Sequence, residues 1–189
     1  MHTDPKDPHG QDLDHIIREL GMDKGQVIFS TQKIPPQDMA KLYNMADCTI
    51  NISDAEGFGL ATLESLSCAT PIIATMTGGL QEQVTDGETE FGVALEPASK
   101  AIIGSQEIPW IYEDRLNGKD VTDAMQKMFE MDPDERKKLG ELGKAHVDNN
   151  YSFESFEAKW VELMDETMKK CGSWADRKGK ANWTLKEIS

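Results

Sequence analysis

Short apolar runs alternate with amphipathic stretches along most of this chain. Near the start, apolar residues recur at i, i+3, i+4 and i+7, a period that predicts a helix ending at Gly21. These residues are Leu13, Ile16, Ile17 and Leu20. The apolar run QVIFS at residues 26–30 then predicts a strand.

The same alternation continues toward the middle of the chain. It predicts a helix after two prolines and a second helix before the next apolar run, at residues 39–46 and 60–68. It also predicts strands at residues 48–52, 71–75 and 91–95. Strands that alternate with amphipathic helices are typical of α/β folds. The sequence therefore predicts a parallel sheet flanked by helices.

The second half of the chain has fewer periodic signals. GGLQEQVTDG predicts a short turn or helix, and residues 97–118 predict a long loop that is functional or an insertion. Three helices are predicted after this loop: one from about Val121, one from Asp132 with Pro133 at its first position, and one after Ser152. The third carries an apolar face with Phe156, Trp160, Leu163 and Thr167.

The predicted strand-helix-strand unit at residues 48–75 contains the loop DAEGFG. A unit this short predicts a tight right-handed crossover between parallel strands. Ligands of open parallel sheets bind beyond the carboxyl ends of the strands, which is where this loop must lie. The loop is therefore a candidate site on topology alone.

The net charge of the chain disfavours some classes of binding partner. The 189 residues include 20 basic and 34 acidic ones, a net charge of −14, which disfavours nucleic acid and anionic membrane surfaces. No apolar run approaches the roughly 18 residues of a membrane span, and the start has no signal-peptide pattern, so we expect a cytoplasmic protein. Cys48, Cys68 and Cys171 are expected to be buried, reduced thiols, and no cluster predicts a metal site.

The stretch EGFGLATLE combines features that suit a sugar nucleotide. Gly57 and Gly59 let the main chain approach a ligand, and the start of the following helix attracts a phosphate. Glu64 is placed to accept hydrogen bonds from two ribose hydroxyls. Glu56 is placed to accept from a sugar or to stabilise positive charge at an anomeric carbon. The pattern leaves open that both glutamates only favour the helix dipole or face solvent.

The stretch NISDAEGFGLATLESLSCATPIIATMTGGLQEQVTDG resembles the donor-binding domain of retaining GT-B glycosyltransferases of the family 4 group, whose signature is E-x7-E. Further blocks in the family's order are LGMDKGQVIFS, MAKLYNMADCTINIS and the closing YSFESF helix, so the resemblance covers about residues 10–170. It implies a Rossmann-like, incomplete C-terminal half of a GT-B fold at residues 1–170, with a loosely held tail at residues 171–189.

The resemblance also implies roles for individual residues. Glu56 matches the first glutamate of the signature, which acts near the donor sugar, and Glu64 matches the second, which holds the ribose. The residues implied to lie against sugar and diphosphate are Gly57, Phe58, Gly59 and Leu60. Gly78, Gly79 and Glu82 match a G-G-x-x-E turn beside the donor pocket, where Glu82 serves equally well as a helix cap or a solvated residue. Ser30 and Thr31 match the main chain that meets the base, or form an ordinary loop. No cofactor or metal is implied.

The sequence departs from the family pattern at several places. Ala61 replaces a common proline and Ala69 a common glycine, both mild changes. The acceptor-binding domain and the first donor-domain strands, with an arginine and a lysine that face the diphosphate, have no counterpart here. Trp110 and Tyr112 either contact an acceptor or pack. Base, sugar and acceptor are not predicted.

Two functions compete at this point. The first is transfer of a sugar from a nucleotide-sugar donor to an unknown acceptor, with retention of anomeric configuration. The second is a non-catalytic nucleotide-binding or assembly module, such as a truncated or split glycosyltransferase that forms a homodimer or pairs with a separate acceptor-domain chain. A phosphoacceptor receiver domain is disfavoured, because no aspartate pair follows an early strand.

Overall fold

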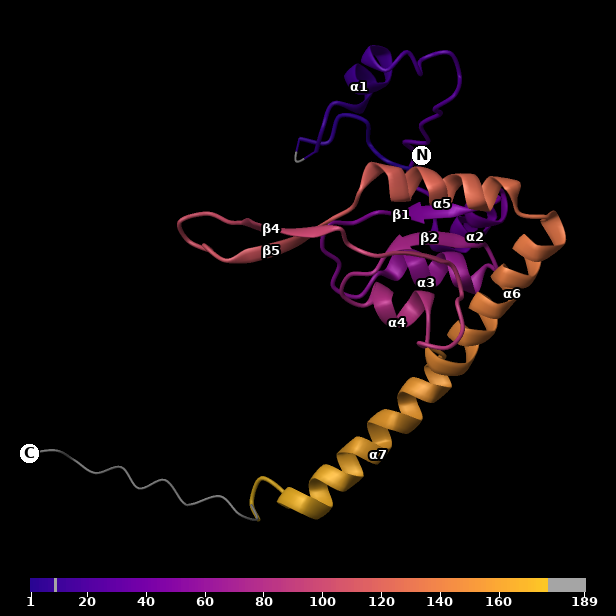
Figure 1. Cartoon of the computed structure of the whole chain (residues 1–189). Helices are drawn as coiled ribbons and strands as arrows, with labels where there is room; N and C mark the ends of the chain where they lie inside the picture. Colours follow the sequence, from indigo (N-terminus) through magenta and orange to yellow (C-terminus); the bar gives the residue numbers. More distant parts are fainter. Residues whose placement is uncertain (9, 177–189) are drawn as a thin grey trace, which may run out of the picture. The chain divides into compact units, whose positions relative to one another are not determined.

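A computed structural model describes residues 1–8 and 10–176 of the chain (Figure 1). The chain forms two compact units, Met1–Met39 and Ala40–Ser189. The tail predicted at residues 171–189 falls mostly outside the described residues, so that prediction stays open.

The first unit contains the helix predicted near the start. α1 (Leu13–Glu19) begins after Asp12, whose carboxylate accepts from the main-chain N–H of His15 at 3.0 Å. Leu20 caps its C-terminus, and Gly21 follows with a φ of +67°. Glycine adopts this left-handed conformation without the steric cost of a side chain. The predicted end of the helix at Gly21 is confirmed.

The strand predicted at residues 26–30 is wrong. Within the described residues, β pairing of this segment is limited to an isolated parallel bridge between His2 and Ser30. The N–H of Ser30 donates to Met1 O at 2.8 Å, and that of Thr3 to Ser30 O at 3.1 Å. Ile28 is 73% exposed. A strand needs a partner along its length, and this apolar run has one for a single residue only.

The second unit is built on a three-stranded parallel sheet in the order β1-β2-β3. Its strands are β1 (Thr49–Asn51), β2 (Ile72–Thr75) and β3 (Val93–Leu95). The register pairs Ile50 with Ile73 and Ala74 with Ala94. All three lie within the predicted ranges, and the α/β class with a parallel sheet flanked by helices is confirmed.

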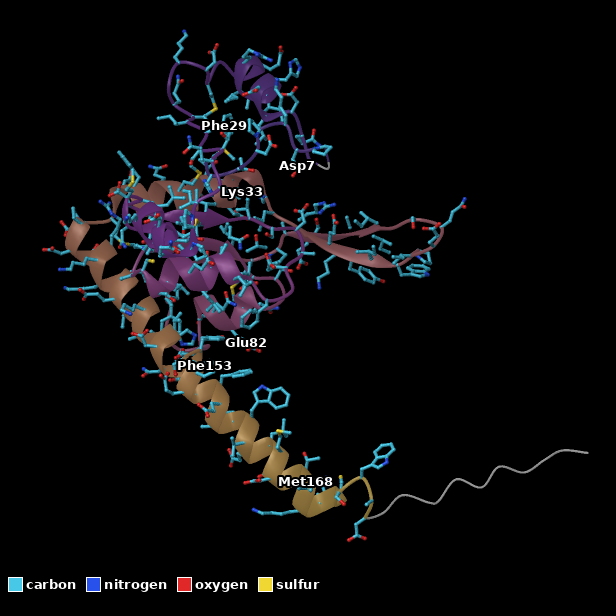
Figure 2. The ribbon with its side chains drawn as sticks, turned by 180° about the vertical axis from the view of Figure 1, so that it is seen from behind. Asp7, Phe29, Lys33, Glu82, Phe153 and Met168 are labelled. Atoms are coloured by element: carbon cyan, nitrogen blue, oxygen red, sulfur yellow. The ribbon has the colours of Figure 1, made fainter. Side chains whose placement is uncertain are left out.

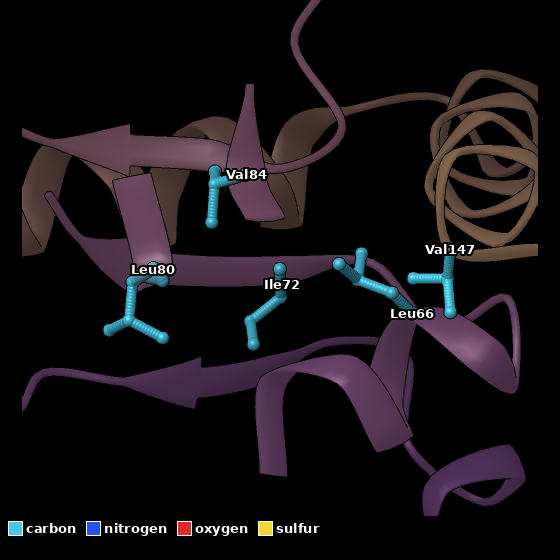
Figure 3. Close-up of a cluster of buried hydrophobic side chains, with 6 residues drawn as sticks. Leu66, Ile72, Leu80, Val84 and Val147 are labelled. Carbon is cyan, nitrogen blue, oxygen red and sulfur yellow. The ribbon is translucent and has the colours of Figure 1, made fainter. Parts of the chain in front are cut away.

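Helices cover both faces of the central strand β2. These helices are α3 (Leu60–Ser67), α4 (Leu80–Val84), α5 (Gly118–Glu130) and α6 (Pro133–Asn150). The second unit also contains α7 (Phe153–Cys171), and α2 (Pro36–Asn44) starts in the first unit. Ile72 belongs to one buried cluster with Leu66, Leu80, Val84 and Val147 (Figure 3). This cluster joins β2 to α3, α4 and α6.

The other face of β2 packs against α5. Ile73 lies in a second buried cluster with Val93, Leu95, Ala124 and Met128. Successive strand residues point to opposite faces, so the adjacent Ile72 and Ile73 serve the two clusters. A parallel sheet buried on both faces explains why its strands read as continuous apolar runs.

The closing helices start where the sequence predicts. Asp132 caps α6 by accepting from the N–H of Asp134 at 2.9 Å, with Pro133 at the first helical position. Ser152 caps α7 by accepting from the N–H of Ser155 at 3.2 Å. The apolar side chains along α7, from Phe153 to Met168 in Figure 2, are exposed within this chain.

The loop predicted at residues 97–118 is instead largely a β-hairpin. β4 (Ser99–Ile103) pairs antiparallel with β5 (Ile111–Arg115), in a register that sets Ile102 opposite Tyr112. Trp110 is 70% exposed and Tyr112 59% exposed, so neither packs into this chain's core. Apolar residues lie on both faces of the hairpin, and the alternation that identifies a half-buried strand is therefore missing.

Candidate functional site: two loops at the carboxyl end of the sheet

The loop after β1 is shaped by hydrogen bonds around Asn51, the last residue of that strand. Asn51 Nδ2 donates to Thr62 Oγ1 at 3.1 Å and ties the strand end to α3. Asn51 Oδ1 accepts from Ser53 N at 3.2 Å and from Ser53 Oγ at 2.7 Å. Ser53 Oγ also lies 3.5 Å from Glu56 Oε2. The network therefore reaches the half-buried Glu56.

Gly59 converts this loop into the start of α3. Its φ is +86°, and a Cβ at this position would lie 2.4 Å from Leu80 Cδ2. Both the backbone conformation and the close approach therefore require glycine. The first N–H groups of an α-helix have no acceptor within the helix, and the dipole is positive at that end. The start of α3 is thus a favourable place for an anion.

The loop after β2 packs main chain to main chain on the loop after β1. Gly79 N donates to Gly57 O at 3.0 Å. A Cβ on Gly78 would lie 1.7 Å from Glu56 O, and a Cβ on Gly79 would lie 2.6 Å from Phe58 O. Because β1 and β2 are parallel neighbours, both loops lie at the carboxyl end of the sheet. This is the edge where open α/β sheets bind ligands.

The buried side chain of Gln83 on α4 joins the two loops a second time. Its Nε2 donates to Phe58 O. Its Oε1 has no hydrogen-bond partner among the described residues and would lie 3.2 Å from a Cβ at Gly59. Gln83 therefore fixes the main chain of the loop two residues before α3 begins.

Glu64 lies on the exposed face of α3 and is held by one side chain. Tyr43 on α2 donates its hydroxyl proton to Glu64 Oε2 at 2.8 Å. Leu60, one turn earlier, is also exposed and shares that helix face. Burial of the phenol and its hydrogen bond to Glu64 raise the pKa of Tyr43 well above its ordinary value. The phenol is therefore a donor to Glu64 throughout the neutral range.

An aromatic cluster from α6 supports the outer side of the loops. The ring of Phe58 meets the ring of Tyr151 edge to face at a centroid distance of 6.1 Å. The main-chain carbonyl of Glu82 lies 2.9 Å from His146 Nε2 and accepts from Tyr151 Oη at 3.3 Å. Glu82 itself is an exposed residue of α4 (Figure 2), and its carbonyl fixes α4 to α6. Desolvation by burial, followed by the charge of Glu82, raises the pKa of Tyr151.

The β4–β5 hairpin is anchored to the same site. Arg115 Nη1 lies 2.9 Å from Asp54 Oδ2, and Arg115 Nη2 lies 2.7 Å from Glu113 Oε2. The main-chain N–H of Asp114 donates to Asp54 O at 2.7 Å. Asp54 stands two residues before Glu56. The ion pair and the main-chain hydrogen bond therefore attach the hairpin to the loop that carries Glu56.

The structure brings most of the predicted site residues together. The five residues from Glu56 to Leu60 form one continuous loop and helix start, with Gly78 and Gly79 packed against them and Glu64 one turn into α3. Thr31 belongs to the first unit, and its part in the site stays a prediction. No sugar or nucleotide contact is thereby tested, and the assigned roles remain predictions.

Sequence reasoning missed the residues that support this site. Tyr43, Asn51, Gln83 and Arg115 act through contacts between elements that are distant in sequence. Asn51 carried a signal, because a polar residue at the end of an apolar run and before a glycine-rich loop is a typical site-lining position. The other three follow no local pattern.

No group of three or more His, Cys, Asp and Glu side chains among residues 1–8 and 10–176 is arranged to hold a metal ion. The three cysteines are unpaired; Cys48 and Cys68 are half-buried, but Cys171 is exposed, which corrects the expectation for that thiol. Burial raises the pKa of Cys48 to about 11. Among the described helices, none is long and apolar enough to cross a membrane.

Comparison with curated proteins gives several D-inositol 3-phosphate glycosyltransferases among the relatives of this chain. The D-inositol 3-phosphate glycosyltransferase of Paenarthrobacter aurescens is 26% identical over 137 residues, which cover 72% of this chain and 28% of the relative. That of Corynebacterium urealyticum is 28% identical over 151 residues, which cover 80% of this chain and 30% of the relative. The chain thus spans less than a third of the length of these relatives.

Solved structures share the fold. The sucrose-phosphate synthase of Thermosynechococcus elongatus superposes with a TM-score of 0.65 at 24% identity, over 86% of this chain and 37% of that one. Such neighbours are GT-B glycosyltransferases, which matches the predicted partial Rossmann-like half. The family model described as glycosyl transferases group 1 matches residues 8–128, so this chain belongs to the group 1 glycosyl transferases.

Proposed function

We propose that this chain is the donor-binding part of a retaining GT-B glycosyltransferase of the family 4 group, which transfers a sugar from a nucleotide-sugar to an acceptor. The observation that carries this proposal is the packing of the two glycine loops around the start of α3. It sets an anion-attracting helix terminus between two carboxylates, Glu56 before it and Glu64 after it. The sugar, the diphosphate and the ribose of a nucleotide-sugar follow one another in the same order.

Each part of the site then has a chemical task. The N–H groups at the start of α3 receive the diphosphate, and the glycines allow it to approach the main chain. Glu64 accepts from the ribose hydroxyls. Glu56 stabilises the positive charge that develops at the anomeric carbon as the bond from this carbon to the diphosphate oxygen breaks and the bond to the acceptor oxygen forms. The nucleoside diphosphate leaves, and the proton of the acceptor hydroxyl passes to it or to water. We propose that no protein-bound metal takes part and that the protein is cytoplasmic.

The relatives support the same kind of substrate. Curated relatives are named as glycosyltransferases, and the sucrose-phosphate synthase fold is shared over most of this chain. Identities in this range do not transfer the acceptor. Base, sugar and acceptor therefore stay outside the proposal.

Calorimetric titration tests the donor site directly. The chain is titrated with UDP, GDP and ADP and with their sugar conjugates, and Glu64→Ala serves as the variant. We expect saturable binding of one base series that Glu64→Ala weakens strongly. Absence of binding in every series contradicts a donor site in this chain. Analysis of the product's anomeric configuration by NMR, with an acceptor that supports turnover, then tests retention.

A non-catalytic assembly module is the second candidate. It is favoured by β1, an edge strand of the described sheet whose Ile50 is 47% exposed, and by Ile52 directly after this strand, which is 50% exposed. An exposed edge with apolar side chains is a pairing surface for another chain. Analytical ultracentrifugation across a concentration series separates the two candidates: self-association without nucleotide binding supports the module.

A further inference from the structure

The phenol of Tyr43 and the carboxylate of Glu64 form a directed pair on the surface of the second unit. Tyr43 Oη lies 2.8 Å from Glu64 Oε2, the usual distance of a hydrogen bond between two oxygens. Among the described residues, Tyr43 is the only hydrogen-bond donor to this carboxylate. Glu64 Oε1 is thus available to another donor.

Tyr43 is itself held in place. Thr70 Oγ1 donates to the main-chain carbonyl of Tyr43 at 3.0 Å. Thr70 is buried and lies three residues after the end of α3, and Ser65 Oγ on that helix donates to the Thr70 carbonyl at 3.1 Å. The end of α3 therefore fixes the backbone of Tyr43, and the Tyr43 side chain returns to the middle of α3 at Glu64. The contact closes a ring of bonds between the two helices.

We propose that Tyr43 is a positioning residue for donor binding: it fixes the rotamer of Glu64 and occupies one carboxylate oxygen, so that the other oxygen meets a ribose hydroxyl. This inference rests on the proposed function of the site. An exposed glutamate otherwise samples several rotamers, and ordering such a side chain on binding costs roughly threefold to tenfold in affinity. Tyr43 orders the Glu64 side chain before the nucleotide binds, so that binding no longer carries this cost.

The charge and exposure of the pair agree with this role. Glu64 is exposed, so the carboxylate needs no partner for burial. A tyrosine that only filled space would not need its hydroxyl directed at one oxygen of a solvated carboxylate. Burial, reinforced by Glu64, raises the pKa of the Tyr43 phenol, which keeps the donor proton on the tyrosine.

Tyr43→Phe tests the inference, because it removes the hydroxyl and keeps the ring. The variant is titrated calorimetrically with the nucleoside diphosphate that the wild-type chain binds. We expect the dissociation constant to rise roughly threefold to tenfold. The matched probe is the 2′,3′-dideoxy form of the same diphosphate, which offers no ribose hydroxyls; for this probe we expect wild type and Tyr43→Phe to bind equally.

A double variant separates positioning from a structural role. In the Glu64→Ala background, Tyr43→Phe is expected to cause no further loss of affinity, because the residue that it orients is gone. Near-ultraviolet circular dichroism and thermal unfolding confirm that each variant is folded.

Three results overturn the inference. An equal loss with the dideoxy probe, or an added loss in the Glu64→Ala background, assigns Tyr43 a general structural role. Unchanged binding by Tyr43→Phe, while Glu64→Ala abolishes binding, rejects the role of Tyr43 and leaves the donor site intact. Failure of the wild-type chain to bind any of the diphosphates removes the proposed function together with the inference.

Discussion

Glu56 and Glu64 belong to one signature, but the molecule holds them by different means. Glu56 lies in a loop whose main chain contacts a second loop at Gly78 and Gly79, without intervening side chains. Glu64 lies on a regular helix, and the phenol of Tyr43 orients its carboxylate. The first glutamate is positioned by the backbone, the second by a side chain.

This difference predicts different sensitivity to substitution. Backbone contact leaves no space for adaptation, since an added methyl group must displace main chain. A side-chain hydrogen bond at the surface is replaced by water at modest cost. Changes around Glu56 should therefore affect folding and binding together, whereas changes around Glu64 should affect binding with little effect on stability.

Gly78→Ala should have the largest effect. The new Cβ would lie 1.7 Å from Glu56 O, at a residue with a φ of +50°. We expect the free energy of unfolding to fall by about 3 kcal/mol or more, from the clash and the left-handed backbone together. Urea unfolding monitored by circular dichroism measures this change.

Gly57→Ala is the matched control for that substitution. A Cβ at Gly57 has no atom within 4 Å, although the residue belongs to the same loop. We expect its stability to stay within about 0.5 kcal/mol of wild type. Equal losses in the two variants would mean that general loop rigidity, and not contact between the loops, holds Glu56.

Gln83→Met should have the next largest effect on stability. The substitution keeps the length of the buried side chain and removes the donor to Phe58 O. We expect a loss of about 1–2 kcal/mol in the free energy of unfolding, because a carbonyl loses its partner while an unpaired amide oxygen is also removed. The same change at exposed Gln81, on the same helix, should cost less; the reverse order would show that Gln83 does not join the loops.

Ala69→Gly tests the backbone strain at the C-terminal end of α3, the helix that carries Glu64. Ala69 follows the C-cap of α3 with a φ of +56°, and its N–H donates to Leu66 O at 2.9 Å. This is the position at which helices commonly end with a left-handed glycine. We expect thermal unfolding to show a stability gain of about 0.5–1 kcal/mol. A loss of stability would mean that contacts of the Ala69 methyl group outweigh the backbone strain.

The smallest expected effect is the loss of stability at alkaline pH, which depends on the contact of Tyr43 with Glu64 and does not involve Glu56. The folded state raises the pKa of Tyr43 above its ordinary value near 10, first by burial and then through Glu64. Above that pH the unfolded chain releases the proton first, so the free energy of unfolding falls as the pH rises. Tyr43→Phe should make this fall shallower in urea unfolding series from pH 9 upward.

The control for the alkaline series is Glu64→Gln. It removes one cause of the raised pKa and leaves burial, so its slope should lie between those of wild type and Tyr43→Phe. A wild-type slope in Tyr43→Phe would show that Tyr43 does not contribute, and that other groups with raised pKa values, such as Cys48 and Tyr151, account for the alkaline loss.

Ala69 replaces a glycine that is common in the family, and only the structure shows the consequence of this change. In the sequence it is a mild exchange of glycine for alanine, since nothing in the residues themselves gives the φ of that position. The close contact of Gly140 on α6 with Ala69 O, where a Cβ would lie 2.0 Å away, further confines this turn. A small residue and a left-handed backbone therefore meet at the end of the helix that presents Glu64.

The sequence by itself determined the parts whose physics is local. Apolar runs between turn residues predicted β1, β2 and β3, because a strand buried on both faces needs continuous apolar residues. Asp132 with Pro133, and Ser152, predicted the starts of α6 and α7 through capping. Alternation of strand and helix also predicted that DAEGFG lies at the carboxyl end of the sheet, and this was the main guide to the candidate site.

Only the tertiary structure decided the features that depend on distant partners. The apolar run at residues 26–30 forms no strand, because strand formation needs a neighbour that sequence does not supply. The β4–β5 hairpin forms through pairing across its own turn, with exposed apolar residues that carry no periodic signal. Tyr43 meets Glu64 across 21 residues and Gln83 meets Phe58 across 25. Such contacts arise from the packing of whole elements, and for that reason the support of the site could not be read from the chain.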